Sequence, residues 1–292
     1  MVIQSERVWL YGSFFPAHII VANGQILDIK MGLIPDVDYD YGQRRIVPGF
    51  IDIHAHGGWN YDSNENDPAG LRRWASNLPR EGVTAFCPTT VTDDHPILIS
   101  ALRNIANVML APPAGAEILG IHLEGPFLNP LYRGAQPEKA IRQASLDDFI
   151  AYEQAAEGQI VAITLAPEMD PGHTLIRYCK EKNIVVSMGH SDASFDQTLE
   201  AMNNGAISVT HVYNGMAKYI NREPGLLGAA WRLDGLYSEL IADGIFVSLV
   251  SAANLFHVKN DDYVIMISDS MKAKGEAPGR YMFGGEPMLL GV

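Results

Sequence analysis

The chain has 292 residues, 47% of them apolar, and a formal net charge of −13 at pH 7. This length and composition predict a globular protein with a sizeable core. The acidic balance without clustered Lys and Arg argues against a nucleic-acid partner. No apolar run approaches the roughly 20 residues that span a bilayer, and the N-terminus lacks a signal-peptide pattern, so we expect a cytoplasmic protein with no membrane association. Cys87 and Cys179 are too few for a disulfide framework and are expected to be reduced and buried.

Residues 1–45 predict the N-terminal part of a small β domain. Apolar runs at 7–11, 18–22 and 25–29 are typical of short strands. Asn23-Gly24, between the last two runs, is a strong signal for a β-hairpin. Because so short a β segment rarely closes a sheet by itself, we expect it to need partners from elsewhere.

Residues 46–292 predict a second, catalytic domain in which buried strands alternate with helical patterns. Eight parallel strands alternating with helices are typical of a (β/α)8 barrel. An open doubly wound sheet is the alternative, but no glycine-rich dinucleotide fingerprint follows the first strand. The expected strands are 45–53, 84–87, 118–123, 160–165, 184–188, 207–210, 237–242 and 263–267. The expected helices are 69–80, 96–109, 146–156, 173–181 and 195–203.

Ionisable side chains follow several of these strands, at the end where barrel active sites are built. Glu124, leaving a buried strand just before Gly-Pro, would be costly to desolvate without a partner. A divalent cation supplies such a partner, and a structural salt bridge is the alternative. With His190 and His211, Glu124 would form a site of two histidines and one carboxylate, leaving positions for water and substrate as in hydrolytic metal centres.

His54 and His56 alternate onto one face of the first strand and could hold a further ion, whereas two surface histidines are the alternative. His122 shares a face with Glu124 and is either a ligand or a hydrogen-bonding neighbour. Asp269 follows the last strand and could accept a proton from water and return it to a leaving group, the alternative being a helix N-cap. Arg222 lies in a Pro-Gly loop and could bind a phosphate, and Asn214 could hydrogen-bond sugar or phosphate oxygens, whereas two ordinary surface residues are the alternative.

Seven motifs occur in order along nearly the whole chain and together resemble one family, the N-acetylglucosamine-6-phosphate deacetylases of the amidohydrolase superfamily. They are Pro48-Gly49-Phe50-Ile51-Asp52, His122-Leu123-Glu124-Gly125-Pro126-Phe127, Leu165-Ala166-Pro167-Glu168, Gly189-His190-Ser191-Asp192-Ala193, Thr210-His211-Val212-Tyr213-Asn214-Gly215-Met216, Arg222-Glu223-Pro224-Gly225 and Asp243-Gly244.

The resemblance implies hydrolysis of the N-acetyl group of N-acetylglucosamine 6-phosphate, in amino-sugar catabolism and cell-wall recycling, by a homodimer. It implies a barrel with a small β-sandwich domain and a divalent ion, zinc or iron, with a second ion where the family has His-x-His. The residues that it implies are Glu124, His190 and His211 for the catalytic ion, His54 and His56 for the second, Asp269 as acid and base, Asn214, Gly215 and Arg222 for the sugar phosphate, and Gln136 near the amide carbonyl.

Two departures from the family pattern leave alternatives open. Phe246 stands where the family has a histidine near the substrate, so N-acetylgalactosamine 6-phosphate is an alternative substrate. The sequence also ends at Gly291-Val292, before the last helix and the returning strands that complete the family's β domain. A truncated paralogue that binds sugar phosphates without catalysis is therefore a further alternative.

Overall fold

The computed structural model describes residues 1–291, without the side chain of Glu286, and Val292 of the predicted barrel domain lies outside the described residues. The chain forms two compact units, Met1–Phe50 and the residues from Ile51 onward. Over residues 1–291 the longest helix has 15 residues, and no helix is long and apolar enough to cross a membrane. Cys87 and Cys179 are both buried, as predicted.

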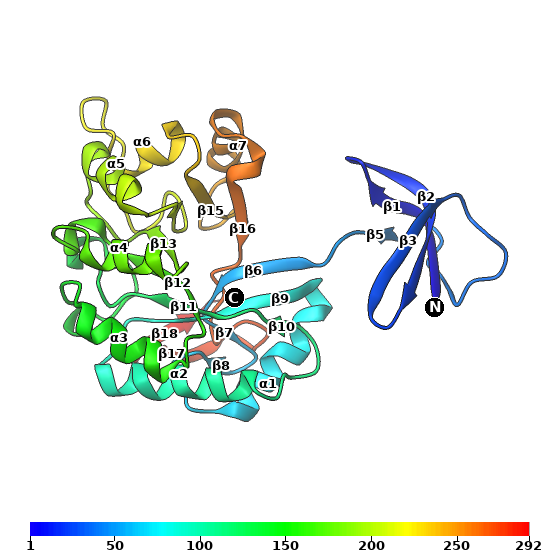
Figure 1. The fold of residues 1–292 in the computed structure, drawn as a ribbon, viewed down its shortest axis with the longest axis horizontal. Coiled ribbons are helices and arrows are strands. Elements are labelled where there is room, and N and C mark those ends of the chain that lie inside the picture. Colours follow the sequence, from blue (N-terminus) through cyan, green and yellow to red (C-terminus); the bar gives the residue numbers. More distant parts are fainter. Residues whose placement is uncertain (292) are drawn as a thin grey trace. The chain divides into compact units, whose positions relative to one another are not determined.

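The N-terminal unit is a small β-sheet (blue in Figure 1). Its main strands, β1 (Val2–Leu10), β2 (Ser13–Ala22) and β3 (Gln25–Met31), are antiparallel, and the short β4 (Tyr39–Asp40) and β5 (Arg45–Ile46) run parallel to β1. The predicted hairpin is confirmed: Ala22 pairs with Gln25, and Asn23 and Gly24 both have positive φ, 52° and 74°. Val8, Ala17 and Ile19 form its small core.

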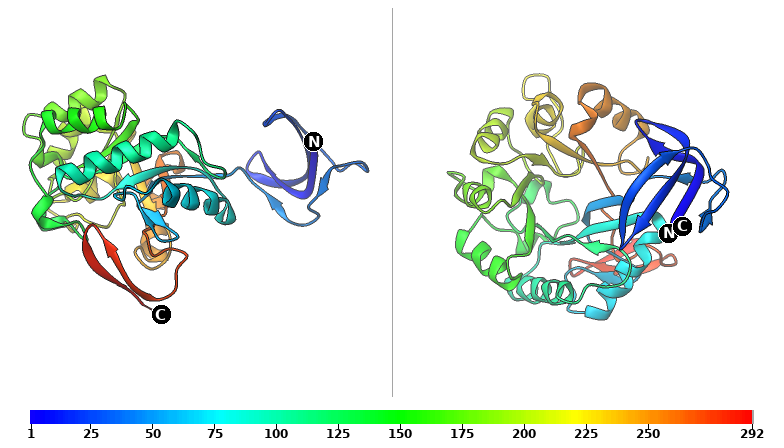
Figure 2. Two further views of the ribbon diagram at one scale, coloured as in Figure 1. Left: turned by 90° about the horizontal axis from the view of Figure 1, so that it is seen from below. Right: turned by 45° about the vertical axis from the view of Figure 1, so that its right-hand side comes forward.

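The second unit is a nearly closed parallel barrel of eight strands, which confirms the predicted fold class. Figure 2, in its right-hand view, shows helices ranged around the strands. The strands in order around the barrel are β6 (Phe50–Ala55), β9 (Val83–Thr90), β11 (Ile121–Glu124), β12 (Ile160–Leu165), β13 (Val185–Met188), β14 (Ser208–Val209), β15 (Tyr237–Ile241) and β16 (Val264–Ile267), with the short β10 (Glu117–Ile118) beside β9.

Two of the expected strands are each divided in the structure. The strand expected at 45–53 splits into β5 and β6 around Pro48, which has no backbone N–H for a sheet ladder. The strand expected at 118–123 splits into β10 and β11 at Gly120, whose φ of +157° and close contact with Val161 leave no room for a side chain.

Among residues 1–291, seven helices cover the barrel strands, and each of the five predicted helices is present. They are α1 (Pro68–Asn77), α2 (His95–Met109), α3 (Leu146–Ala155), α4 (Thr174–Glu181), α5 (Phe195–Asn204), α6 (Gly225–Arg232) and α7 (Leu249–Val258), the last two not predicted. Helix α5 starts at a capping box, in which Ser194 and Gln197 satisfy each other's backbone N–H groups. One continuous core joins helices and strands, with Trp74 of α1 packed 4.7 Å from Phe86 of β9 between ring centroids.

Short elements complete the unit and include two hairpins. They are the hairpin of β7 (Gly57–Gly58) and β8 (Tyr61–Asp62), the hairpin of β17 (Gly279–Phe283) and β18 (Glu286–Leu290), and the 3₁₀ turns Leu78–Glu81, Pro130–Tyr132, Glu138–Ala140, Pro167–Met169 and Asp261–Tyr263. The hairpin β17–β18 (red in Figure 2) brings Phe283 against His56, with ring centroids 5.4 Å apart.

The last strand meets the first through a seam of individual hydrogen bonds. The buried carboxylate of Asp52 accepts from the N–H of Ser268 at 3.2 Å and from its hydroxyl at 2.5 Å. The N–H of Asp269 donates to the carbonyl of His54 at 2.9 Å, and the N–H of His56 donates to the carbonyl of Ser270 at 2.7 Å. These bonds place Asp269 directly beside His54 and His56.

Candidate metal centre and active site

Six of the predicted site residues converge at the carboxyl ends of the barrel strands. They form two sets, and within each set the ligand atoms all lie within 4.8 Å of one another. The first ligand group comes from β11 and from the loops after β13 and β14, and the second comes from β6, the residue that follows it and the segment after β16. The first ligand group is Glu124, His190 and His211, and the second ligand group is His54, His56 and Asp269.

The first ligand group is buried and compact. Oε1 of Glu124 lies 3.2 Å from Nε2 of both His190 and His211, and the two imidazole Nε2 atoms are 3.1 Å apart. Ligands held tetrahedrally about 2.1 Å from a zinc ion would be roughly 3.4 Å from one another. The three donor atoms therefore have the spacing of a single metal site.

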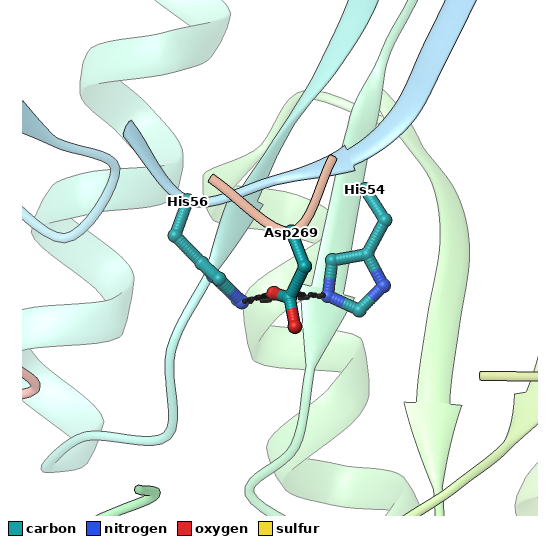
Figure 3. Close-up of side chains that lie close together, drawn as sticks. All are labelled: His54, His56 and Asp269. Carbon is teal, nitrogen blue, oxygen red and sulfur yellow. Dashed lines mark hydrogen bonds and ion pairs between the residues drawn. The ribbon is translucent and has the colours of Figure 1, made fainter. Parts of the chain in front are cut away.

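The second ligand group adjoins the first through the same glutamate. In Figure 3 the carboxylate of Asp269 lies between the two imidazoles, with Oδ1 3.1 Å from Nε2 of His56 and 3.6 Å from Nε2 of His54. Glu124 is 3.3 Å from each of these histidines, through Oε1 to His54 and Oε2 to His56. Glu124 therefore lies where it could bridge two ions.

The hydrogen bonds on the far side of the imidazoles fit metal binding. Nδ1 of His190 lies 2.8 Å from the carbonyl of Tyr132, and Nδ1 of His56 lies 3.0 Å from the carbonyl of Thr89. A carbonyl only accepts, so each Nδ1 must carry the proton and each Nε2 must offer a lone pair when the ring is neutral. Nε2 of His54 and Nε2 of His56 are only 3.3 Å apart, and facing lone pairs at this distance repel unless a proton or a metal ion lies between them. The donor set therefore suits divalent ions.

Charges in this cluster shift the pKa values of its members when no ion is bound. Burial alone would lower the pKa of His56, but Asp269 and Glu124 raise it to about 9. Burial alone would raise the pKa of Asp269, but the hydrogen bond to His56 and the charges of the histidines lower it. Asp269 is therefore ionised at neutral pH, as a proton acceptor must be.

His122 is the hydrogen-bonding neighbour rather than a ligand. Its Nδ1 lies 3.1 Å from the carbonyl of Ile53, and its Nε2 lies 2.8 Å from the hydroxyl of Thr164. Burial, followed by the nearby charge of His54, lowers the pKa of His122 to about 4. The ring is therefore neutral, and both of its nitrogens take part in hydrogen bonds outside the two ligand groups.

The sequence interpretation missed Glu239, a residue of β15 that is 2% exposed. Its Oε2 lies 2.9 Å from Nδ1 of His54. A signal was present in Tyr237-Ser238-Glu239-Leu240-Ile241, because a carboxylate in an apolar strand needs a buried partner, as Glu124 does.

Three ligand residues have backbone conformations that are rare for residues other than glycine. The φ angles of His190, His211 and Asp269 are 49°, 28° and 48°. Such conformations cost on the order of 1–3 kcal/mol each and cluster at functional sites. Each of these residues follows a barrel strand closely, and its side chain joins one of the two ligand groups.

Gly215 packs directly against the side chain of His190, and this contact leads to a prediction. A Cβ at Gly215 would lie 2.8 Å from Nδ1 of His190, and φ at Gly215 is +56°. Gly215→Ala is therefore expected to displace His190 and to weaken metal binding at the first ligand group by about 10-fold or more, measured by competition with a chelator. Gly134→Ala is the matched control, because Gly134 has the same φ but its Cβ would be 3.6 Å from His190. Equal metal affinity in the two variants would contradict the prediction.

A cavity of about 370 Å³ opens onto both ligand groups. Gln136, Asn214 and Gly215 of the predicted substrate residues line it, together with Phe246, whereas Arg222 is exposed and lies outside its lining. The side-chain nitrogen of Gln136 donates to Oε2 of Glu124, and its oxygen accepts from the N–H of Thr92 at 2.8 Å. Met271, Phe283 and Met288 add an apolar wall.

Comparisons with known proteins agree with this geometry. The Amidohydrolase family model matches residues 45–276. An N-acetylglucosamine-6-phosphate deacetylase of Bacillus subtilis (strain 168) is 43% identical over 248 residues, which are 84% of this chain and 63% of that protein. An N-acetylgalactosamine-6-phosphate deacetylase of Escherichia coli O157:H7 is 37% identical over 293 residues, covering 99% of this chain and 76% of that protein. The chain thus spans just under two thirds of the length of its Bacillus relative.

Solved structures show the same architecture. An N-acetyl-D-glucosamine-6-phosphate deacetylase variant from Mycobacterium smegmatis, in complex with N-acetyl-D-glucosamine-6-phosphate, matches with a TM-score of 0.92 and 28% identity over 98% of this chain and 75% of that one. A Thermotoga maritima N-acetylglucosamine-6-phosphate deacetylase matches with a TM-score of 0.87 and 27% identity, over 100% of this chain and 76% of that one. By its sequence, its barrel and its ligand groups, the chain belongs to the amidohydrolase family.

Proposed function

We propose that this protein hydrolyses the N-acetyl group of N-acetylglucosamine 6-phosphate, giving glucosamine 6-phosphate and acetate. The observation that carries the proposal is the pair of ligand groups sharing Glu124 beside the ionised Asp269, all opening onto one cavity. The substrate class comes from the names of the relatives, in which the same chemistry is assigned to amino-sugar phosphates.

The chain's own residues divide the work of the reaction. Glu124, His190 and His211 would hold the catalytic ion, zinc or iron, and His54, His56 and Asp269 would hold a second one with Glu124 between them. When bound, such an ion polarises a carbonyl and lowers the pKa of water.

Asp269 moves the proton. Its side chain is 25% exposed, more than any other member of the two ligand groups, and it lines the cavity. As a carboxylate it accepts a proton from the attacking water and then protonates the departing amine, which leaves as the amino group of the product.

The remaining cavity residues orient the substrate. Gln136 uses one N–H on Glu124, so its second N–H is free to donate to the acetyl carbonyl. Asn214 and Gly215 line the cavity where sugar oxygens would lie. We assign Arg222 to the phosphate because a guanidinium binds phosphate bidentately, and its exposure suits an arginine offered to a second copy of the chain in a homodimer.

The cavity also carries the feature that favours a second substrate. Phe246 lines it with the side chain largely exposed and cannot donate a hydrogen bond to a sugar hydroxyl. The relative from Escherichia coli O157:H7, an N-acetylgalactosamine-6-phosphate deacetylase, matches nearly the whole chain. N-acetylgalactosamine 6-phosphate is therefore the second candidate.

Acetate release from both sugar phosphates tests the proposal, with the protein first stripped of metal and then loaded with Zn²⁺ or Fe²⁺. We expect turnover only in the loaded protein, and a higher kcat/KM for the glucosamine derivative. A preference for the galactosamine derivative would support the second candidate. No acetate from either substrate with either ion would contradict both.

Light scattering at several protein concentrations tests the homodimer, and fractionation of cells tests the cytoplasmic location that we propose for an enzyme of phosphorylated sugars.

A further inference from the structure

Glu239 is a buried carboxylate that the proposed reaction does not use. It projects from β15 and lies next to His54, which is itself fully buried. Its Oε2 is 2.9 Å from Nδ1 of His54, and its Oε1 is 3.4 Å from the hydroxyl of Ser187. An ionised carboxylate in such a place is destabilising unless a cationic or strongly donating partner offsets the loss of solvent. His54 is that partner.

The contact distinguishes His54 from the other ligand histidines. Nδ1 of His56 and Nδ1 of His190 face neutral carbonyl oxygens, and Nδ1 of His211 has no hydrogen-bond partner among residues 1–291. Within that part of the chain, His54 is thus the one ligand histidine whose Nδ1 faces a carboxylate. A carboxylate on the far nitrogen fixes the tautomer of a ligand histidine and raises its basicity toward a metal.

A row of hydroxyls holds Glu239 from its other side. Ser187 lies 2.7 Å from Thr210, and Thr210 lies 2.8 Å from Thr164, which in turn contacts His122. Because Nδ1 of His122 faces a carbonyl and must donate, its Nε2 accepts from Thr164. Thr210 donates to Ser187, so the hydroxyl proton of Ser187 is available to Glu239, whose carboxylate accepts from His54 at 2.9 Å and from Ser187 at 3.4 Å.

The balance of charge in the site also links Glu239 to the second ligand group. Two divalent ions bring four positive charges into a buried site in which Glu124 and Asp269 supply two negative ones. Glu239 adds a third negative charge, and its hydrogen bond to a ligand histidine is the one to His54 of the second ligand group. Its effect should therefore be larger for the second ion than for the first.

We infer that Glu239 is a positioning residue that enables the second ligand group, His54, His56 and Asp269, to hold its own ion. It does so by keeping the proton of His54 on Nδ1, with Nε2 toward the ion, and by offsetting the charge of that ion. The inference rests on the metal pair of the proposed function. It predicts that loss of Glu239 converts a protein with two ions into a protein with one.

The test counts ions rather than turnover. Metal-free wild type and Glu239→Gln are titrated with Zn²⁺ against a chelator, and bound zinc per chain is measured by atomic emission. We expect two ions in the wild type, and in Glu239→Gln an unchanged first ion and a second ion weakened by about 10- to 100-fold. Asp170→Asn is the matched control, because Asp170 is also a buried carboxylate but accepts from backbone N–H groups of α4, away from the ligand groups.

The possible results separate the inference from the proposed function. If the wild type binds one ion or none, the metal pair itself is wrong, and the role of Glu239 is overturned with it. If the wild type binds two ions and Glu239→Gln binds both equally well, Glu239 alone is overturned. Weakening of both ions to the same extent, or the same loss in Asp170→Asn, would also overturn it. In a His54→Ala background, Glu239→Gln should have a smaller effect on metal binding than in the wild type, because the contact through His54 is already lost and only the charge of Glu239 remains to be removed.

A second variant covers the case in which Glu239→Gln does not fold. Glu239→Asp keeps the negative charge, so the net charge of the buried region is unchanged. Its side chain is one methylene too short for the 2.9 Å contact with His54. We expect it to weaken the second ion while the first is retained. Wild-type affinity for both ions in Glu239→Asp would overturn the positioning role.

Discussion

Asp269→Asn is expected to lower kcat for acetate release by about 10³-fold, within the range measured for loss of a general acid and base, while KM changes little. The amide has the same shape as the carboxylate and can still contact His56, but it cannot accept a proton from water. Acetate release is measured at saturating Zn²⁺, so that any weakening of the second ion does not limit the rate.

The control for this prediction is again Asp170→Asn, whose buried carboxylate lies outside both ligand groups. It should keep nearly wild-type kcat. An Asp269→Asn protein that retains kcat to within a few-fold at full metal loading would remove Asp269 from proton transfer. The acid and base would then have to be sought among the other cavity residues.

Glu124→Gln is expected to abolish both metal binding and activity. Glu124 is the one carboxylate in contact with all four ligand histidines in the described part of the chain, with distances of 3.2–3.3 Å. The amide is neutral and offers one oxygen in place of two, so it can no longer present an anionic oxygen to both ligand groups. Removal of a shared ligand should therefore empty both groups, with loss of more activity than any single histidine variant shows.

Metal content and thermal unfolding measure this effect independently of turnover. An ion that binds only the folded state raises Tm in proportion to the logarithm of its concentration. Added Zn²⁺ should raise Tm of the wild type and leave Tm of Glu124→Gln unchanged. His56→Ala is the informative comparison, because it should retain the first ion and part of the Tm increase. Two zinc ions bound to Glu124→Gln would refute the bridging role.

Much of the barrel could be predicted because its strands are apolar runs that end in polar residues. Glu124, His190 and His211 were recognisable since each follows a buried strand, and parallel strands bring their carboxyl ends to one place. Glu239 was missed because it lies in the middle of a strand, not at its end, although its burial required the same kind of partner.

The unpredicted elements lack a clear periodic signal. Helix α6, Gly-Leu-Leu-Gly-Ala-Ala-Trp-Arg, contains two glycines and is almost entirely buried, and α7 carries apolar residues on both its exposed and its buried sides. The hairpin β17–β18 could have been found, because Gly284 and Gly285 form its two-residue turn, both with positive φ. The position of Phe283 against His56 could not, since it depends on tertiary packing.

The seam at Asp52 has a consequence for how the protein would acquire the proposed activity. The first ligand group comes from residues 124 to 211, on strands that pair along the barrel, whereas Asp52 and Ser268 are 216 residues apart in the chain. Contacts between distant parts of a chain form slowly, because their loop-closure entropy is lost before the contact is gained. The second ligand group, which includes the proposed proton acceptor Asp269, is therefore assembled only when the first and last strands meet. During refolding the chain should pass through a form that binds one metal ion and is not yet an enzyme.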